Sequence, residues 1–488
     1  MKDALEALLA TAQVRRNEGA WGEAIRLFRQ AEQAAPGSAA IKHNLALCHY
    51  AIGDVGAARQ QAADAVRRDP ALWQSQALLA RIARSEGRPE VASAAWEGVL
   101  RSSPGNASAL LGLADLDMNE YGDAAAASLR VTPIRTSPSH AADAELTRLM
   151  AALYTGTDGA EPLSAGLIAF SKAHLRLPKL PPRTLRAERR RIGIVSPLLS
   201  ISPVYYLTFS TFLALSRAHD LVIFSRGSKV DGATERFRSI AAEWMEVQSI
   251  DAGALAQQLA GAELDILFDL GGWSDVVGLQ AMSAKPAARM YTWVGGQSAT
   301  TGIDAFDGWI GDALQSPAEH AGLYAEPLLN MAGGYIDYTP PPELSALADL
   351  PKRGTALVGN PAKIVPATLV AWPDSVDRVT LIDRRYAHNR TLGRVRDLLG
   401  GKGVAVEAVI VPEGHADYLR ALAGCGAIIN TQPYAAGLTA VEALHLGVKL
   451  LSAGTPGPLF SARHHLSHRA SGGRNPALAA AMLKLVSE

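Results

Sequence analysis

The sequence predicts a helical-repeat array followed by two doubly wound α/β sheets, on the basis of three observations. The first is a 34-residue period in the N-terminal part of the chain. The second is a change near residue 190 to short apolar runs that alternate with helical segments, the rhythm of βαβ units. The third is the length of 488 residues, which at about 150 residues per domain indicates about three domains.

Proline, alanine and glycine recur at the 34-residue step. The alanines let two helices approach closely, and the glycines fall where one helix must turn into the next. Phe28 and Trp96 fill the space between hairpins, whereas Arg130 takes that place in a degraded fourth unit. The pattern resembles tetratricopeptide repeats over about residues 3 to 138 and predicts a surface that binds a protein. The recurring positions are Pro36, Pro70, Pro104 and Pro138; Ala24, Ala58, Ala92 and Ala126; Ala12, Ala46, Ala80 and Ala114; and Gly19, Gly53 and Gly87.

These signals divide the chain into four segments. An amphipathic helix that includes Leu149 and Leu153 is expected to cap the repeats, and a proline-containing linker then leads into two α/β halves. The expected boundaries are 1–140 for the repeat array, 141–190 for the cap and linker, 191–345 for the first α/β half and 346–488 for the second.

The linker ends in a basic run. Such a run could contact RNA, but no aromatic residue interleaves the charges, as stacking on bases would require. A solvated junction between domains is therefore the favoured interpretation. The arginines are Arg183, Arg186, Arg189, Arg190 and Arg191.

The charge balance selects neither a nucleic acid nor a membrane as partner. Lys and Arg total 47, and Asp and Glu also total 47. Cys48 and Cys425 lie far apart among small or apolar residues, which fits buried thiols in a reducing compartment, and no metal-ligand spacing occurs. The chain start lacks a signal-peptide core and no apolar run reaches spanning length, so we expect a cytoplasmic protein.

Short apolar runs predict the strands of the two parallel sheets. Val204 to Ala218 and Ala233 to Trp244 are expected helices between them. In such folds a ligand lies beyond the carboxyl ends of the strands, in the cleft between the halves. The predicted strands are 192–195, 221–224, 264–268, 288–294, 355–359, 379–382, 404–411, 427–429 and 448–451.

A strand-turn-helix stretch from Asn430 to Gly447 marks the expected ligand position. Gly437 would allow a close backbone approach before the helix, whose free N–H groups form a ready site for phosphate oxygens. Glu442, one turn later, could accept bonds from a ribose. An ordinary strand-to-helix connection is the alternative. The absence of a glycine fingerprint after the first strand, and of a Walker loop, argues against a dehydrogenase and an NTPase.

Several segments resemble a known family. Lys285 to Gly296, Gly359 to Pro366 and Phe460 to Arg463 are similar to motifs of the O-linked N-acetylglucosamine transferases, as is the stretch that begins at Asn430. The resemblance extends over nearly the whole chain. It implies a GT-B catalytic domain of two Rossmann-like halves after the repeats, with a nucleotide sugar as co-substrate.

The resemblance also implies roles for individual residues. Lys363 would be the catalytic cation that neutralises the departing diphosphate, and the amides of Leu438 and Thr439 would hold its oxygens. Asn360 would add a bond, and Glu442 would take the ribose. No metal or other cofactor is implied. The expected donor-binding residues are Asn360, Gly437, Leu438, Thr439, Glu442, Gly295, Gly296 and Arg384.

Departures from the family pattern affect the acid/base chemistry. Ser202 stands where a histidine is expected, and Trp273 stands where a second histidine or a tyrosine is expected. The usual acid/base candidate is therefore absent. The alternatives are His388, His415, His464, His465 and His468, expected mainly at the surface, and Asp269, Asp275 and Asp304, expected mainly in turns or caps.

The leading hypothesis is a glycosyltransferase that moves a sugar, such as N-acetylglucosamine from its UDP donor, to a Ser or Thr hydroxyl of a protein held by the repeats. The first alternative is a flagellin glycosyltransferase that uses a CMP-linked nonulosonic acid. The altered sugar pocket, whose loop Gln297-Ser298-Ala299 lengthens, leaves room for that donor, and some repeat-bearing members that the chain resembles glycosylate flagellin. The second is a repeat scaffold without catalysis, which the residues at 202 and 273 would explain.

Overall fold

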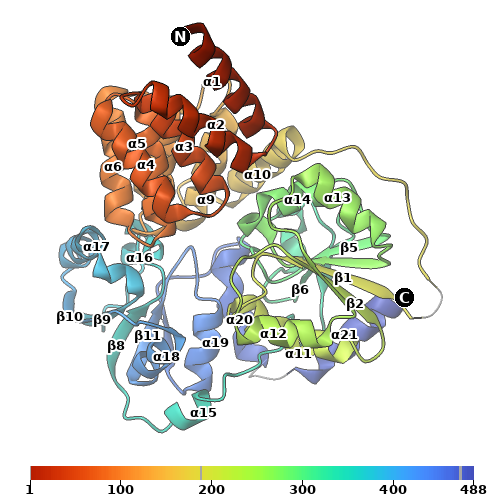
Figure 1. The fold of residues 1–488 in the computed structure, drawn as a ribbon. Coiled ribbons are helices and arrows are strands. Elements are labelled where there is room, and N and C mark those ends of the chain that lie inside the picture. The colour runs from red at the N-terminus through yellow and green to blue at the C-terminus, as the bar shows by residue number, and fades with distance from the viewer. Residues whose placement is uncertain (1, 187–188, 472–474) are drawn as a thin grey trace. The chain divides into compact units, whose positions relative to one another are not determined.

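The computed structural model describes residues 2–186, 189–471 and 475–488 and divides the chain into two compact units (Figure 1). The first unit comprises Met1–Glu120 and Ala125–Arg148, and the second comprises Tyr121–Ala124 and Leu149–Glu488. Each unit contains hydrophobic clusters of its own.

Helical hairpins with the predicted 34-residue period form the N-terminal part. Gly19, Gly53 and Gly87 have φ values of +76°, +78° and +68°, a left-handed conformation that glycine adopts without a Cβ penalty. Each therefore lies where the first helix of a hairpin turns into the second. Ala46 and Ala80, at recurring positions, have no exposed surface. The helices are α1 (Lys2–Asn17), α2 (Trp21–Ala34), α3 (Ala39–Ala51), α4 (Val55–Arg68), α5 (Trp73–Ser85), α6 (Pro89–Ser102), α7 (Ala107–Asn119), α8 (Ala124–Val131), η1 (Thr132–Ile134) and α9 (Ala141–Thr155).

The fourth hairpin departs from the pattern in its packing. Phe28 and Trp96 are 1% and 5% exposed in the first and third hairpins. At the corresponding place in the fourth, Arg130 forms an ion pair with Asp117, whose side chain is fully buried. The fourth hairpin thus has an ion pair where the first and third have a buried aromatic side chain.

Two parallel sheets form the core of the second unit, as the strand pattern predicts. The first has the order β3-β2-β1-β4-β5-β6-β7 and the second has the order β10-β9-β8-β11-β12. In each sheet the chain crosses to the other side of the first strand, between β1 and β4 and between β8 and β11, which creates a topological switch point. The strands are β1 (Arg191–Ser196), β2 (Asp220–Ser225), β3 (Glu243–Glu246), β4 (Ile266–Asp269), β5 (Arg289–Thr292), β6 (Gly308–Gly311), β7 (Leu328–Asn330), β8 (Arg353–Val358), β9 (Arg378–Ile382), β10 (Ala405–Ile410), β11 (Cys425–Asn430) and β12 (Lys449–Ser452).

Helices cover these sheets, and the last one returns to the first sheet (Figure 1). In α21, Leu478, Met482 and Val486 join the cluster that contains Phe212 of α11, so the C-terminal helix completes the layer over the first sheet. The helices are α10 (Ala160–His174), α11 (Pro203–Leu215), α12 (Gly232–Ile240), α13 (Ala252–Gly261), η2 (Gly272–Ser274), α14 (Val276–Met282), η3 (Ala318–Leu323), α15 (Leu344–Leu347), η4 (Pro361–Lys363), α16 (Pro366–Val370), η5 (Arg384–Ala387), α17 (Asn389–Gly401), α18 (His415–Ala423), α19 (Leu438–His445), α20 (Phe460–Ser471) and α21 (Pro476–Ser487).

One predicted helix is wrong at its end. The segment expected to continue to Trp244 stops at Ile240, and Glu243–Glu246 forms the edge strand β3. Its Trp244 and Met245 are only partly buried, so the segment lacks the apolar run of a central strand. The structure also adds β6, β7 and α10, which the apolar pattern does not predict.

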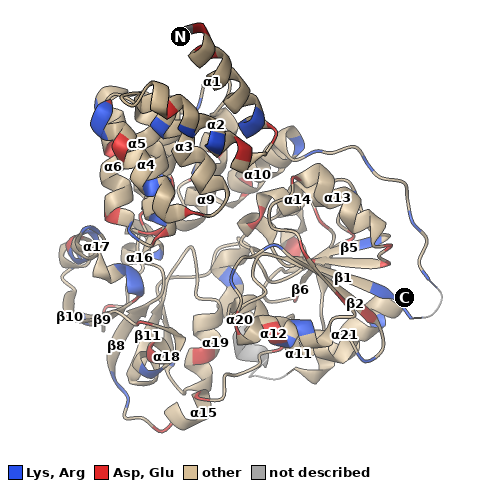
Figure 2. Cartoon of the chain, in the orientation of Figure 1, with Lys and Arg blue, Asp and Glu red and all other residues tan. Residues whose placement is uncertain are grey.

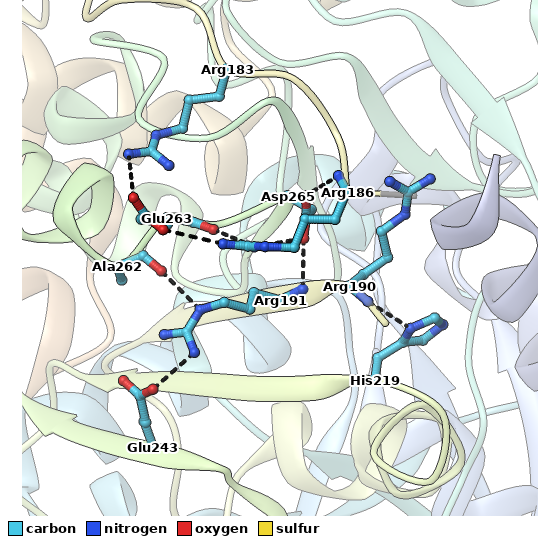
Figure 3. Close-up of polar contacts among 9 residues, drawn as sticks. All are labelled: Arg183, Arg186, Arg190, Arg191, His219, Glu243, Ala262, Glu263 and Asp265. Carbon is cyan, nitrogen blue, oxygen red and sulfur yellow. Dashed lines mark hydrogen bonds and ion pairs between the residues drawn. The ribbon is translucent and has the colours of Figure 1, made fainter. Parts of the chain in front are cut away.

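Carboxylates pair with Arg183, Arg186 and Arg191 of the run that enters the first sheet (Figure 3). Asp265 accepts the backbone N–H groups of Arg186 and Arg191, both at 2.7 Å, and Nη1 of Arg186 at 2.9 Å. Burial would raise the pKa of Asp265, but these hydrogen bonds lower it overall. Arg191 also pairs with Glu243 at 2.9 Å. The run is therefore a junction held by ion pairs, which supports the favoured interpretation over RNA binding.

Acidic and basic residues are interspersed through the helices and strands of both units (Figure 2). Within the described ranges, no helix combines the length and apolar character needed to cross a membrane.

Candidate active site

A cavity of about 370 Å³ opens in the second unit at the carboxyl ends of strands from both sheets. The loops that follow β1, β5, β8 and β11 reach it, together with α18 and α20. Parallel α/β sheets bind ligands at this edge. The predicted site residues that line the cavity are Lys363, Gly295, Gly296, Gly437, Leu438, Thr439 and Glu442.

Lys363, at the end of η4, is partly buried in the cavity wall. Its Nζ donates to the carbonyl oxygen of Ala435 at 2.9 Å and lies 4.9 Å from the ring centroid of Tyr434. Burial lowers the pKa of Lys363 to about 8; Asp383 opposes this shift and Arg385 adds to it. The ammonium is thus charged at neutral pH but poorly solvated.

The turn before α19 presents backbone amides to the cavity. Gly437 precedes the helix without a side-chain cap, and a Cβ there would meet only Nδ1 of His464, at 3.6 Å. Leu438 and Thr439 begin the helix, where the first N–H groups have no partner within the helix. With the positive end of the helix dipole, these amides suit an anionic oxygen.

Glu442 reaches the cavity with its carboxylate already bound to protein. Oε1 lies 2.8 Å from Nε2 of His415, and only 1% of Glu442 is exposed. Burial raises the pKa of Glu442, and the hydrogen bond and charge of His415 counteract part of this shift. On the other side of the imidazole, Nδ1 lies 3.1 Å from the hydroxyl of Tyr206 on α11. A ribose hydroxyl at Glu442 would join this network.

His415 is therefore a cavity residue, contrary to its expected place at the surface. Its side chain is 27% exposed, and Tyr418, one turn later on α18, stacks beside it with ring centroids 5.7 Å apart. The position of His415 in the chain could have indicated this place. It begins α18, which follows β10 at the same edge of the sheet as the turn before α19.

Tyr434 is a further cavity residue that the sequence analysis did not single out. Its ring stacks on Tyr154 at 4.5 Å with an interplanar angle of 8°. Its hydroxyl lies 2.8 Å from Oγ of Ser298, in the loop after β5. The Tyr434–Ser298 and His415–Tyr206 contacts both join the first sheet region to the second across the cavity.

The glycine pair after β5 is required by backbone packing. A Cβ at Gly295 would overlap the carbonyl oxygen of Leu270, and a Cβ at Gly296 would overlap that of Gly271. Gly296 also has a φ of +63°. Two loops therefore pack backbone against backbone, and buried Gln297 fixes the turn by donating to the Thr292 carbonyl oxygen at 3.0 Å. The pair still forms part of the cavity wall.

Two predicted donor-binding residues lie outside the cavity lining. The side chain of Asn360 caps η4 by accepting the Ala362 N–H at 3.0 Å, and it also hydrogen-bonds the Tyr154 hydroxyl. Arg384 is exposed on η5. Contact between either residue and a donor stays a prediction.

The residues at the two departures from the family pattern have structural contacts. Ser202 caps α11 and donates from Oγ to the Leu198 carbonyl oxygen at 2.7 Å. Trp273 is 8% exposed, and its Nε1 donates to the Thr300 carbonyl oxygen at 2.9 Å. Trp273 does not line the cavity.

The aspartates proposed as bases have turn, cap or surface positions. Asp269 is buried and accepts the N–H groups of Gly271 and Gly272, and burial raises its pKa to about 7. Asp275 caps α14 and pairs with Arg226. Asp304 is exposed, with Lys179 at 3.6 Å.

Among the other histidines, His464 lines the cavity. His388 lies edge-on to Tyr121 with centroids 5.4 Å apart, and His465 is 2% exposed. The side chain of His468 lies outside the described part of the chain.

Comparison with known proteins finds a repeat family that matches the N-terminal part and named relatives that match about half of the chain. The family described as "Tetratricopeptide repeat" matches residues 16–82. "Probable UDP-N-acetylglucosamine--peptide N-acetylglucosaminyltransferase SPINDLY" of Solanum lycopersicum is 25% identical over 279 residues, which are 52% of this chain and 30% of that protein. The protein of the same name from Arabidopsis thaliana is 26% identical over 278 residues, 53% of this chain and 30% of that protein. These matches span less than a third of the length of either relative.

A solved structure supports the same assignment at the level of the fold. A mutant O-GlcNAc transferase of Thermobaculum terrenum aligns with a TM-score of 0.60 and 22% identity, and the alignment covers 100% of this chain and 91% of that one. The repeats, the two parallel sheets and the sequence matches agree. The chain thus has the fold of tetratricopeptide repeats followed by a GT-B domain, and its sequence is similar to that of O-linked N-acetylglucosamine transferases.

Proposed function

We propose that this chain is a glycosyltransferase that moves a sugar from a nucleotide donor, with a UDP-sugar favoured, to a Ser or Thr hydroxyl of an acceptor protein. The supporting observation is that Lys363, the N-terminus of α19 and Glu442 converge on one cavity beside two parallel sheets. The relatives are named for transfer from UDP-N-acetylglucosamine to peptides, which favours this donor class.

The groups around the cavity suit the departure of a nucleoside diphosphate. When the bond between the sugar and the diphosphate breaks, its electron pair leaves with the diphosphate, and an ammonium and backbone amides stabilise the added charge. Lys363 has three N–H donors, of which one bonds to Ala435, so the others remain for phosphate oxygens. The ammonium and amides supply positive charge without a metal.

The acceptor hydroxyl must lose a proton as it forms the new bond to the sugar. The imidazoles of His415 and His464 lie on the cavity wall, and an imidazole is the side chain that most often takes up such a proton. Neither corresponds to the family's usual histidine position at Ser202.

A melting-temperature titration tests the nucleotide site. UDP, UDP-N-acetylglucosamine and CMP are added to the wild type and to Lys363→Ala, with Lys402→Ala as the matched control because Lys402 is exposed beyond α17. A nucleotide at a hundred times its Kd adds about 2.7 kcal/mol of stability. We expect a UDP shift that Lys363→Ala reduces and Lys402→Ala retains.

The other outcomes decide between the alternatives. A shift with CMP alone would replace the UDP donor by a CMP-linked sugar, and purified flagellin would then be tested as the acceptor. Absence of a shift with every nucleotide would overturn the transferase proposal and support the repeat scaffold. With a positive shift, labelled donor and cell extract should yield a labelled protein band.

A further inference from the structure

The repeat unit contains a second cavity, of about 600 Å³, which we call the repeat groove. The first helices of the second, third and fourth hairpins line it, together with Trp96 of α6. Its lining residues include Leu47 of α3, Trp73 and Arg81 of α5, and Leu111 of α7. All of them belong to the first compact unit.

The groove has an aromatic floor. Trp96 lies directly against the backbone of α7, because a Cβ at Gly112 would overlap the indole ring. Trp96 is 5% exposed, whereas Trp73 at the start of α5 is half-buried and leaves part of its ring accessible. Leu47 and Leu111 are also partly buried. Apolar surface in a polar-rimmed groove fits one large side chain of a bound segment.

Among the described residues that line the groove, Arg81 is a cation without a carboxylate partner. Nε of Arg84 lies 2.6 Å from Oδ2 of Asp115, so that pair is neutral overall. Arg81, one turn earlier, is exposed, and its guanidinium lies 5.9 Å from the ring centroid of Tyr50. Among the described residues, Arg81 forms no ion pair.

The titratable groups facing Arg81 do not cancel its charge. Burial lowers the pKa of His43, and Arg16 and Arg81 lower it further, so this imidazole is neutral. Nδ1 of His43 lies 2.9 Å from Oγ of Ser75, which keeps the ring in place. The groove therefore offers a guanidinium to an incoming carboxylate beside an apolar floor.

We infer that the repeat groove binds an extended peptide segment in which an acidic side chain lies beside an aromatic or large aliphatic one. The carboxylate would pair with Arg81, and the neighbouring side chain would pack on Trp73 and over Trp96. The inference rests on the proposed function only in taking this segment to be part of the acceptor protein. The peptide chemistry follows from the groove alone.

An immobilised positional-scanning decapeptide library tests the inference with the full-length protein and no nucleotide. We expect retained peptides to be enriched in Asp or Glu within two positions of an aromatic or large aliphatic residue. Arg81→Glu should remove the acidic enrichment and lower affinity for the best peptide by about tenfold at low salt, with the loss shrinking as salt rises. Arg81→Lys should keep most of the binding. Arg29→Glu on α2 is the matched control, because Arg29 is an exposed arginine outside the groove.

The outcomes separate this inference from the proposed function. No sequence enrichment, or enrichment that Arg81→Glu leaves unchanged while Arg29→Glu abolishes it, would overturn the inference. Melting temperatures of all variants exclude loss of folding. Peptide binding without a nucleotide-induced shift in melting temperature would support the groove inference and overturn the proposed transferase function. Nucleotide binding without peptide enrichment would support the transferase function and overturn the groove inference.

Discussion

Lys363 is the residue whose replacement most directly separates chemistry from folding. We expect Lys363→Ala to lower transfer by at least about a hundredfold, because it removes a cation from the departing diphosphate. Stability should change little, since the loss is one hydrogen bond, worth about 1 kcal/mol, and part of an alkyl chain. Lys363→Arg should restore activity only in part, because a planar guanidinium places its charge differently. Turnover and melting temperature are measured on one preparation, beside Lys402→Ala. Full activity of Lys363→Ala would show that Lys363 takes no part in the transfer reaction.

The lowered pKa of Lys363, about 8, predicts a pH dependence of nucleotide binding. As pH rises through this value the ammonium loses its proton, so the affinity for UDP should fall between about pH 7 and 9. Lys363→Arg stays charged and should show a flat profile. The free energy of unfolding should change with pH in the opposite direction. Between pH 8 and the ordinary lysine pKa of 10.5, Lys363 is more often protonated in the unfolded chain than in the folded one. The folded state therefore becomes more stable as pH rises through this range. Calorimetric titration at several pH values checks the binding, and a wild-type affinity without pH dependence would contradict it.

At the scale of elements, the two loops after β4 and β5 depend on their glycines. We expect Gly296→Ala to destabilise the protein by about 1–3 kcal/mol, because it adds a Cβ at a positive φ and against the Gly271 carbonyl oxygen. Gly393→Ala is the control: Gly393 lies inside α17 with open space around it, and alanine should stabilise that helix by about 0.5–1 kcal/mol. Denaturant unfolding measures both. Equal stability of Gly296→Ala and the wild type would show that the loops can separate.

The elements that the sequence predicts well are those with a strong periodic signal. The 34-residue step predicts the hairpins, because each turn needs a glycine at positive φ and each interface needs a small residue. Apolar runs predict the central strands β1 and β11, which are buried on both faces. The edge strand β3 has no such run, since one side of it meets solvent, and so it looks like the end of a helix.

The candidate site is predicted where backbone chemistry determines it. The turn before α19 can be predicted from the sequence as a phosphate site, because the backbone N–H groups of a helix N-terminus attract phosphate whatever side chains it carries. The places of His415 and Tyr434 in the cavity cannot be predicted in this way, because they depend on contacts with residues distant in the sequence, Glu442 and Ser298. Asn360 carries the family motif, yet it caps η4.

At the scale of the whole molecule, the two compact units should unfold separately. Each has its own hydrophobic clusters, so scanning calorimetry should resolve two transitions. UDP should raise the transition of the α/β unit alone, because the cavity that we propose to bind the nucleotide is lined by residues of that unit. A peptide selected by the repeat groove should raise only the other. One transition that both ligands shift would show that the units unfold as one cooperative body.

We expect the Tyr434–Ser298 and Tyr206–His415 contacts, which join the two sheet regions across the cavity, to slow the entry of a donor. At about 1 kcal/mol for each net hydrogen bond, breaking both costs about 2 kcal/mol, so the form that admits a donor would hold only a few per cent of the molecules. The rate of donor entry would then depend on how often this minor form, with both hydrogen bonds broken, is populated. Replacing both tyrosines by phenylalanine keeps the rings but removes the hydroxyls, and should increase the observed association rate of UDP by about tenfold or more without a new contact to the ligand. Stopped-flow fluorescence measures this rate, and an unchanged rate in the double variant would mean that the cleft is already open when the nucleotide arrives.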